Sequence, residues 1–210
     1  MTFIKICGIT NLEDARVAVE CGADALGFNF YERSPRYIEA AAARQIIAQL
    51  PDSVLTVGVF VNETTEAVEA IANEADVQAL QLHGDESPEY CMAFGGWFVI
   101  KALAVNDNFD VQRIKGYDVG AILLDASHPS LRGGTGKVAD WSVAQRANEM
   151  GKRIVLAGGL GPENIQDAIA TAEPYGVDAC SGLEASPGKK DHERLKSFLE
   201  AIRASEMAES

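Results

Sequence analysis

The chain has 210 residues, of which 47% are hydrophobic and 23% are charged, a composition typical of a single soluble globular domain. The formal net charge of -13 argues against nucleic acids and anionic membranes as partners. No stretch approaches the roughly 18 apolar residues that cross a bilayer, and no signal peptide is recognisable, so we expect a cytoplasmic protein.

Short apolar or β-branched runs alternate with amphipathic helical segments along the whole chain. The strand-like runs cover residues 2–6, 23–29, 54–61, 77–82, 97–103, 119–125, 153–158 and 176–182. Between them apolar residues recur at helical spacing, as at Ala43, Ile46, Ile47 and Leu50, which indicates helices packed on a sheet. The stretch 106–116 is short and polar, and we expect only a loop or a single turn there.

Eight strands alternating with seven or eight helices predict a parallel sheet, because parallel strands need crossover connections. Eight such units close naturally into a (β/α)8 or TIM barrel, an α/β fold for which 210 residues is near the lower limit. An open doubly wound sheet is the alternative, although no GxGxxG follows the first strand. We expect one barrel domain over residues 1–205 and a frayed C-terminal tail over 206–210.

In a TIM barrel the active site lies on the loops that follow the carboxyl ends of the strands. Candidate residues follow most of the predicted strands: Cys7, the loop from Arg33 to Arg36, His83, Asp125, Gly158 with Gly159, and Ser181 with Gly182. The candidates therefore gather at one end of the predicted barrel.

The glycines follow strands seven and eight, whose loops often bind phosphate through backbone N–H groups. Each glycine loop alone could equally be a tight turn, but the two together favour a phosphate site at Gly158, Gly159, Ser181 and Gly182. Arginine offers a planar fork for a carboxylate or a phosphate. Arg33 is more simply explained as a solvated side chain, whereas Arg36 is an open candidate.

Asp125 ends an apolar strand, where partial desolvation would suit a general acid, although capping the next turn explains it equally well. The stretch 126–140 that follows is long and glycine-rich, as in a substrate loop. His83 could contact the substrate or a catalytic residue, but an ordinary hydrogen-bonded histidine beside a turn explains it at least as well.

The four cysteines, Cys7, Cys21, Cys91 and Cys180, show no CxxC spacing, which predicts reduced thiols and no metal site. Strand alternation puts Lys5 and Cys7 on one face, so the lysine ammonium would lower the pKa of the thiol. Asp178 lies on the last strand, adjacent to the first on barrel closure, and can pair with a buried Lys5. The alternative for Cys7 is a buried, inert thiol.

Several of these segments together resemble phosphoribosylanthranilate isomerase over nearly the whole chain. They are KICGIT (5–10), GFNFYERSPRYI (27–38), VGVFVN (57–62), LQLHGDE (80–86), LLDA (123–126), GGTGK (133–137), LAGGLGPENI (156–165) and SGLEASPGKKD (181–191). The resemblance implies an isomerase of tryptophan biosynthesis that converts N-(5-phosphoribosyl)anthranilate to 1-(2-carboxyphenylamino)-1-deoxyribulose 5-phosphate. This Amadori rearrangement is an internal redox reaction that needs no cofactor.

The resemblance also assigns roles to single residues. It makes Cys7 and Asp125 catalytic, Arg36 the ligand of the anthranilate carboxylate, and the two glycine loops the phosphate site. The family occurs as monomers and dimers, so the expected partners are a phosphorylated small molecule and at most a second copy. The chain departs from the family pattern at Cys180 and Leu183, where serine and valine are expected.

Two other functions fit part of the same pattern. One is the histidine-pathway isomerase, which resembles a two-aspartate catalyst on a larger barrel with an internal repeat. The other is a catalytically silent barrel that binds a phosphorylated ligand. Cysteine on the first strand argues against the former, and the combination of Cys7, Asp125 and Arg36 argues against the latter.

Overall fold

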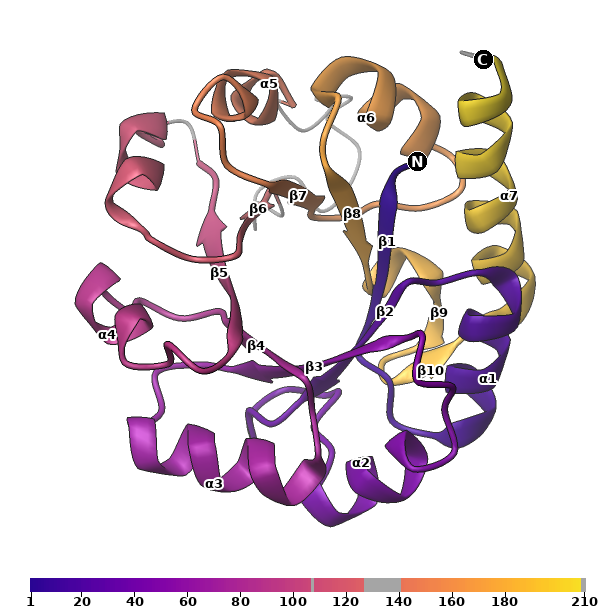
Figure 1. Cartoon of the computed structure of the whole chain (residues 1–210). Helices are drawn as coiled ribbons and strands as arrows, with labels where there is room; N and C mark the ends of the chain where they lie inside the picture. The colour runs from indigo at the N-terminus through magenta and orange to yellow at the C-terminus, as the bar shows by residue number, and fades with distance from the viewer. Residues whose placement is uncertain (107, 127–140, 209–210) are drawn as a thin grey trace.

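A computed structural model describes residues 1–106, 108–126 and 141–208 of the chain. The GGTGK segment and nearly all of the predicted substrate loop at 126–140 lie outside these described residues. The described part forms a barrel of strands surrounded by helices (Figure 1).

All eight predicted strands are present, and each is hydrogen-bonded in parallel to its neighbours in chain order, with β8 closing onto β1. The strands are β1 (Phe3–Cys7), β2 (Ala25–Asn29), β3 (Leu55–Phe60), β4 (Ala79–Leu82), β5 (Phe98–Ala104), β6 (Ala121–Asp125), β7 (Ile154–Ala157) and β8 (Gly176–Ala179). The predicted TIM barrel is confirmed, and the open doubly wound alternative is wrong because the sheet has no free edge.

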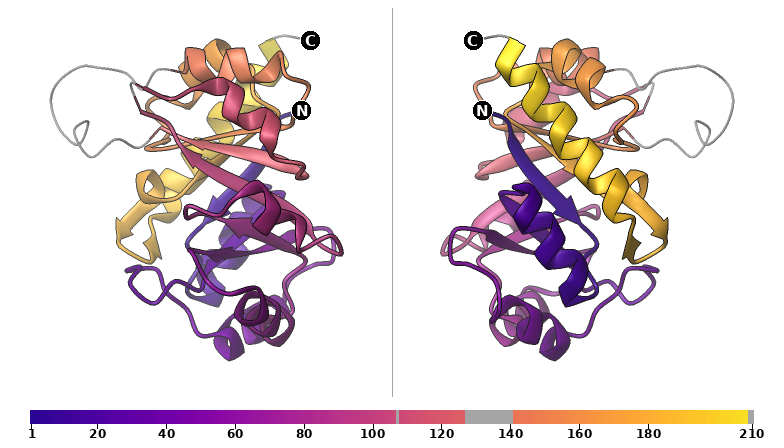
Figure 2. Two further views of the ribbon diagram at one scale, coloured as in Figure 1. Left: turned by 90° about the vertical axis from the view of Figure 1, so that its left-hand side faces the viewer. Right: turned by 90° about the vertical axis from the view of Figure 1, so that its right-hand side faces the viewer.

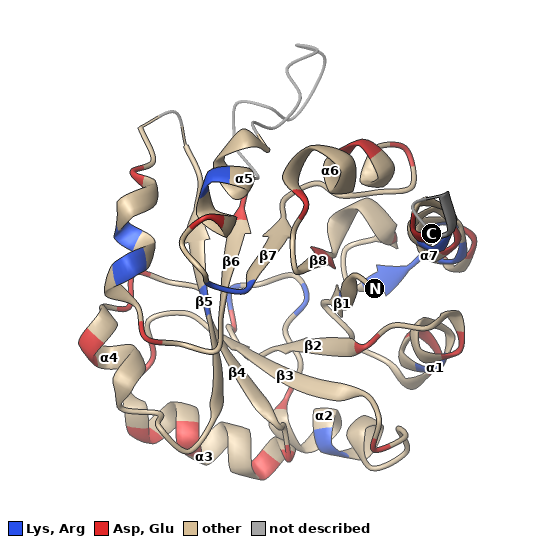
Figure 3. Ribbon diagram, turned by 45° about the horizontal axis from the view of Figure 1, so that its top comes forward, with Lys and Arg blue, Asp and Glu red and all other residues tan. Residues whose placement is uncertain are grey.

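Helices cover the outside of the barrel. They are α1 (Leu12–Cys21), α2 (Ala40–Ile47), α3 (Thr65–Ala75), α4 (Pro88–Met92), α5 (Ser142–Asn148), α6 (Ile165–Ala172) and α7 (His192–Ala208). The described part of the fifth unit has the six-residue 3-10 helix η1 (Val111–Gly116), which at three residues per turn is longer than the loop or single turn expected there. The acidic residues are spread over the outer helices (Figure 3).

Two further features lie at the end of the chain. Helix α7 is the longest of the helices described and ends at Ala208. After β8 the chain forms a short 3-10 helix, η3 (Ser181–Leu183), and a two-stranded hairpin of β9 (Glu184–Ser186) and β10 (Lys189–Lys190). This hairpin lies at the opposite end of the barrel from the N-terminus (Figure 2).

One apolar cluster fills the space between the strands and the helices, and a smaller one fills the barrel interior. The interior cluster consists of Ala25, Val57, Ala79, Ile100, Ala102, Ala121, Leu123, Val155 and Ala157. Side chains alternate along each strand, so the inward row continues toward the carboxyl ends to Cys7 on β1, to Asp125 on β6, and through Gln81 of β4 to His83 after it. The packed interior therefore supports reactive side chains at the mouth of the barrel.

Candidate active site

Cys7 ends β1 at the mouth of the barrel, and its side chain stands in the same inward row as Lys5. Cys7 is 8% exposed and Lys5 is fully buried. On the neighbouring strand Gly27 leaves room for both, since a Cβ there would lie 2.8 Å from Cys7 Sγ and 2.9 Å from Lys5 Nζ. A glycine on β2 therefore lets the ammonium and the thiol occupy one small space.

Lys5 pairs with Asp178, its register partner on β8, at 2.8 Å between Nζ and Oδ1. Burial alone would lower the pKa of Lys5, but the charges of Asp178 and Cys7 raise it above its ordinary value. Burial raises the pKa of Asp178 to about 6, and Lys5 opposes the rise. Near neutral pH both groups are therefore ionised beneath the thiol.

The pKa of the Cys7 thiol lies well below its ordinary value. The largest cause is a hydrogen bond with Cys180, followed by the positive charges of Lys5 and Lys190, while burial opposes the shift. A thiolate held by a neighbouring thiol and two ammonium groups is poised to accept a proton.

A cluster of Cys180, Glu184 and Lys190, which was not predicted from the sequence, lies near Cys7 at the carboxyl end of the barrel, on the hairpin and just before it. The buried Lys190 donates from Nζ to Glu184 Oε1 at 3.2 Å and to the carbonyl oxygen of Cys180 at 3.3 Å, and lies 3.9 Å from Cys180 Sγ. A Pro-Gly pair at 187–188 was the available signal for this turn.

Arg36 lies beside Cys7 because its side chain crosses over Gly8, where a Cβ would lie 2.7 Å from Arg36 Cδ. Gly8 also has a φ of +77°, a conformation that favours glycine. Arg36 donates from Nε and Nη2 to the two carboxylate oxygens of Glu184 at 2.8 and 2.6 Å. Arg33 is exposed, as expected for a solvated arginine.

Asp125 ends β6, and its Oδ2 lies 3.3 Å from His83 Nε2. On the other side of the ring, His83 Nδ1 lies 2.8 Å from the buried Gln81 Nε2, so His83 is held between Gln81 and Asp125. Two strands, β7 and β8, separate Asp125 from Cys7 around the barrel.

The two glycine loops pack directly against each other. Gly158 and Gly159 have φ values of 102° and 67° after β7. Gly182, in η3, admits no side chain, because a Cβ there would lie 2.1 Å from the carbonyl oxygen of Leu160. Arg194 of α7 fixes the loop after β8 by donating to the Gly182 carbonyl at 2.8 Å.

Ser181 and Gly182 are the first residues of η3, so their N–H groups point out of its first turn. With Gly158 and Gly159 close by, the loops provide small residues and main-chain donors for an anion.

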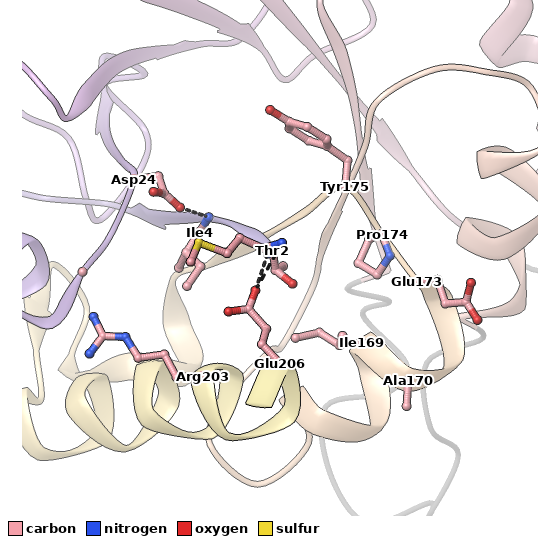
Figure 4. Close-up of a pocket in the computed structure, with 12 residues that line it drawn as sticks. Thr2, Ile4, Asp24, Ile169, Ala170, Glu173, Pro174, Tyr175, Arg203 and Glu206 are labelled. Atoms are coloured by element: carbon pink, nitrogen blue, oxygen red, sulfur yellow. Dashed lines mark hydrogen bonds and ion pairs between the residues drawn. The ribbon is translucent and has the colours of Figure 1, made fainter. Parts of the chain in front are cut away.

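The structure thus brings the candidate residues to one end of the barrel. Among the residues it describes, no group of three or more His, Cys, Asp or Glu side chains is arranged to hold a metal ion, and no helix is both long and apolar enough to span a membrane. A separate open cavity of about 1260 Å³ lies at the amino end, lined by residues such as Thr2, Asp24, Tyr175 and Glu206 (Figure 4). It contains none of the candidate residues.

Comparison with known proteins agrees with the geometry. The family model described as N-(5'phosphoribosyl)anthranilate (PRA) isomerase matches residues 4–201. An N-(5'-phosphoribosyl)anthranilate isomerase of Geobacter metallireducens is 48% identical, over 97% of this chain and all of that protein.

Solved structures give the same result. The phosphoribosyl anthranilate isomerase of Thermotoga maritima superimposes with a TM-score of 0.91 at 46% identity, over 97% of this chain and 100% of that chain. A structure of the isomerase with reduced 1-(o-carboxyphenylamino)-1-deoxyribulose 5-phosphate matches with a TM-score of 0.88 at 43% identity, over the same shares. The chain therefore belongs to the N-(5'-phosphoribosyl)anthranilate isomerase family.

Proposed function

We propose that this chain converts N-(5-phosphoribosyl)anthranilate to 1-(2-carboxyphenylamino)-1-deoxyribulose 5-phosphate in tryptophan biosynthesis, with Cys7 as general base and Asp125 as general acid. The single observation that carries the proposal is the buried, charge-stabilised thiol of Cys7 at a mouth that also holds Asp125, Arg36 and two glycine loops. Because the reaction moves hydrogen within one molecule, its chemistry requires no cofactor.

The reaction begins when the furanose ring opens, which requires a proton on the ring oxygen. Asp125 supplies this proton, and its Oδ2 lies 3.3 Å from His83 Nε2. His83 thereby acts as a positioning residue that aims the acid. Ring opening gives a Schiff base, which makes the proton on the sugar C2 acidic.

The Cys7 thiolate then removes the C2 proton and gives an enolamine, which tautomerises to the ketone. A base works best when its pKa lies near the working pH, and the ammonium of Lys5 brings the thiol toward that range. Asp178 holds Lys5 in the inward row and keeps it charged. Both residues act through Cys7 and are positioning residues.

Arg36 is proposed to bind the anthranilate carboxylate through the guanidinium edge that Glu184 leaves open. Glu184 occupies Nε and one proton of Nη2, so both protons of Nη1 and the second proton of Nη2 remain. These donors form a second fork for a carboxylate. Glu184 therefore orients Arg36 and stays in place when the substrate binds.

The phosphate is proposed to bind at Gly158, Gly159, Ser181 and Gly182. Anchoring a carboxylate at one end and a phosphate at the other holds the reacting carbon between base and acid. The product analogue in the related complex carries the same two groups.

We further propose a cytoplasmic enzyme that acts as a monomer or a homodimer. A related protein from Thermotoga maritima is described as dimeric. Light scattering after size-exclusion chromatography would distinguish the two states of this chain.

The function is tested by supplying purified protein with N-(5-phosphoribosyl)anthranilate and following the fluorescence change, with identification of the product by NMR, because substrate and product are isomers of equal mass. Turnover without added cofactor is the expected result. A silent binding barrel would bind the substrate without turnover, and a histidine-pathway enzyme would act only on that pathway's substrate.

A further inference from the structure

Cys7 and Cys180 stand side by side at the mouth of the barrel. In the parallel ladder Lys5 pairs with Asp178 and Ile6 with Ala179, so the next positions bring Cys7 beside Cys180. Neighbouring strands lie about 4.8 Å apart, within the Cα separation of roughly 4.4–6.8 Å that a disulfide spans. Cys180 Sγ also lies close to Gly8, the residue after Cys7, since a Cβ on Gly8 would lie 2.9 Å from it.

This pair combines a reactive sulfur with a second sulfur in reach. The neighbouring Cys180 thiol and the charges of Lys5 and Lys190 lower the pKa of Cys7, so Cys7 carries the thiolate that reacts with oxidants. Cys7 is 8% exposed at a mouth that must admit a substrate, and Cys180 is partly exposed. Low pKa, access and a neighbouring thiol are the features of redox-sensitive cysteines.

We propose that Cys7 and Cys180 form a modification site at which a hydroperoxide generates a reversible disulfide. The Cys7 thiolate attacks the peroxide O–O bond and takes one oxygen, giving a sulfenic acid while the other oxygen leaves as water after protonation. The Cys180 sulfur then attacks the Cys7 sulfur, the S–O bond breaks, and a second water leaves. Two thiols are oxidised, and one hydrogen peroxide is reduced to two waters.

The first step prepares the second. While Cys7 is a thiolate, its hydrogen bond and negative charge, together with burial, keep the pKa of Cys180 well above the ordinary value. A neutral sulfenic acid at Cys7 removes the charge, leaving Lys190 and Arg36 to favour the Cys180 thiolate. Cys180 therefore becomes the attacking sulfur when it is needed.

The other two cysteines lack this chemistry. Burial raises the pKa of Cys91 to about 11 and also raises that of Cys21. Both therefore remain thiols under mild oxidation, and Cys91 offers a matched control. The loss of activity rests on the proposed role of Cys7, whereas the cross-link itself does not.

The experiment treats the full-length protein with hydrogen peroxide, stops the reaction with catalase, and blocks remaining thiols under denaturing conditions. Tryptic mapping is expected to find residues 6–16 linked to residues 154–189, with Cys21 and Cys91 alkylated. Activity should fall in proportion to the linked fraction and return fully with dithiothreitol. The Cys91→Ser variant should behave in the same way.

Each variant is compared with its own untreated activity. Cys180→Ser cannot form the bond, so prolonged peroxide should carry Cys7 to the sulfinic acid, with a loss that dithiothreitol does not reverse. Absence of the cross-linked peptides while Cys7 becomes sulfinic would overturn the proposal, as would full recovery of Cys180→Ser after the same treatment. A complete cross-link with retained activity would support the modification site and contradict Cys7 as the base.

Discussion

Replacing Gly182 by alanine tests the proposed phosphate site through a steric effect that the structure makes large. The new Cβ would lie 2.1 Å from the carbonyl oxygen of Leu160, where ordinary contact begins near 3.4 Å. The two loops would therefore have to separate by roughly 1 Å, and a misplacement of that size can cost about 100-fold in rate. We expect kcat/KM to fall by about that factor, equivalent to about 2.8 kcal/mol.

The assay measures kcat/KM with the substrate and the inhibition constant of inorganic phosphate, which reports on the phosphate site alone. In Gly182→Ala, kcat/KM should fall and the inhibition constant of inorganic phosphate should rise, while circular dichroism shows a folded barrel. Gly96→Ala is the matched control, because nothing lies within 4 Å of a Cβ at Gly96. Unchanged kcat/KM and unchanged phosphate inhibition in a folded Gly182→Ala variant would refute the placement of the phosphate.

The remaining predictions concern the acid, the carboxylate site and the base. Asp125→Asn cannot donate a carboxyl proton and should lower kcat by about 10²–10⁴-fold with a smaller effect on KM, as measured by steady-state kinetics. Arg36→Ala should act mainly by raising KM, because the carboxylate does not react; Glu184→Gln should raise KM in the same direction but less. Activity requires the Cys7 thiolate, so it is lost as the pH falls through the pKa of Cys7. Lys5→Met removes a positive charge that lowers this pKa. The acidic limb of the kcat/KM profile should therefore move to higher pH.

Each of these predictions has an outcome that contradicts it. Normal turnover in Asp125→Asn would remove that residue as the acid, and an unchanged KM in Arg36→Ala would remove the carboxylate contact. For the pH profile, Lys101→Met is the control. Lys101 is also buried and is paired with Glu86 at 2.7 Å, but it is not among the main causes of the lowered pKa of Cys7. If the Lys5→Met profile does not shift, the charge argument fails.

Much of the barrel could be predicted from local patterns. Runs such as 54–61, where the structure has β3, are apolar because a parallel strand is buried on both faces, so they stand out from the helices between them. The last helix could be predicted as well, because Leu195, Phe198, Leu199 and Ile202 recur at helical spacing within α7.

The contacts within the site could be predicted only where register could be inferred. Lys5 could be paired with Asp178 because the first and last strands of a closed barrel are adjacent. Two residues beyond Lys5 and Asp178, the same register brings Cys7 beside Cys180. The wide spacing of the cysteines in the sequence did not predict that these two would be neighbours. Glu184 was missed because the strands of its hairpin, two and three residues long, are too short to show a periodic pattern.

The most direct test of the whole account is the turnover of Cys7→Ala. The variant keeps Arg36 and the glycine loops, so it should bind the product analogue with nearly unchanged affinity. Its kcat should fall by at least about 10²-fold, since it lacks the proton acceptor at C2. A kcat near that of the unmodified protein would contradict Cys7 as the general base.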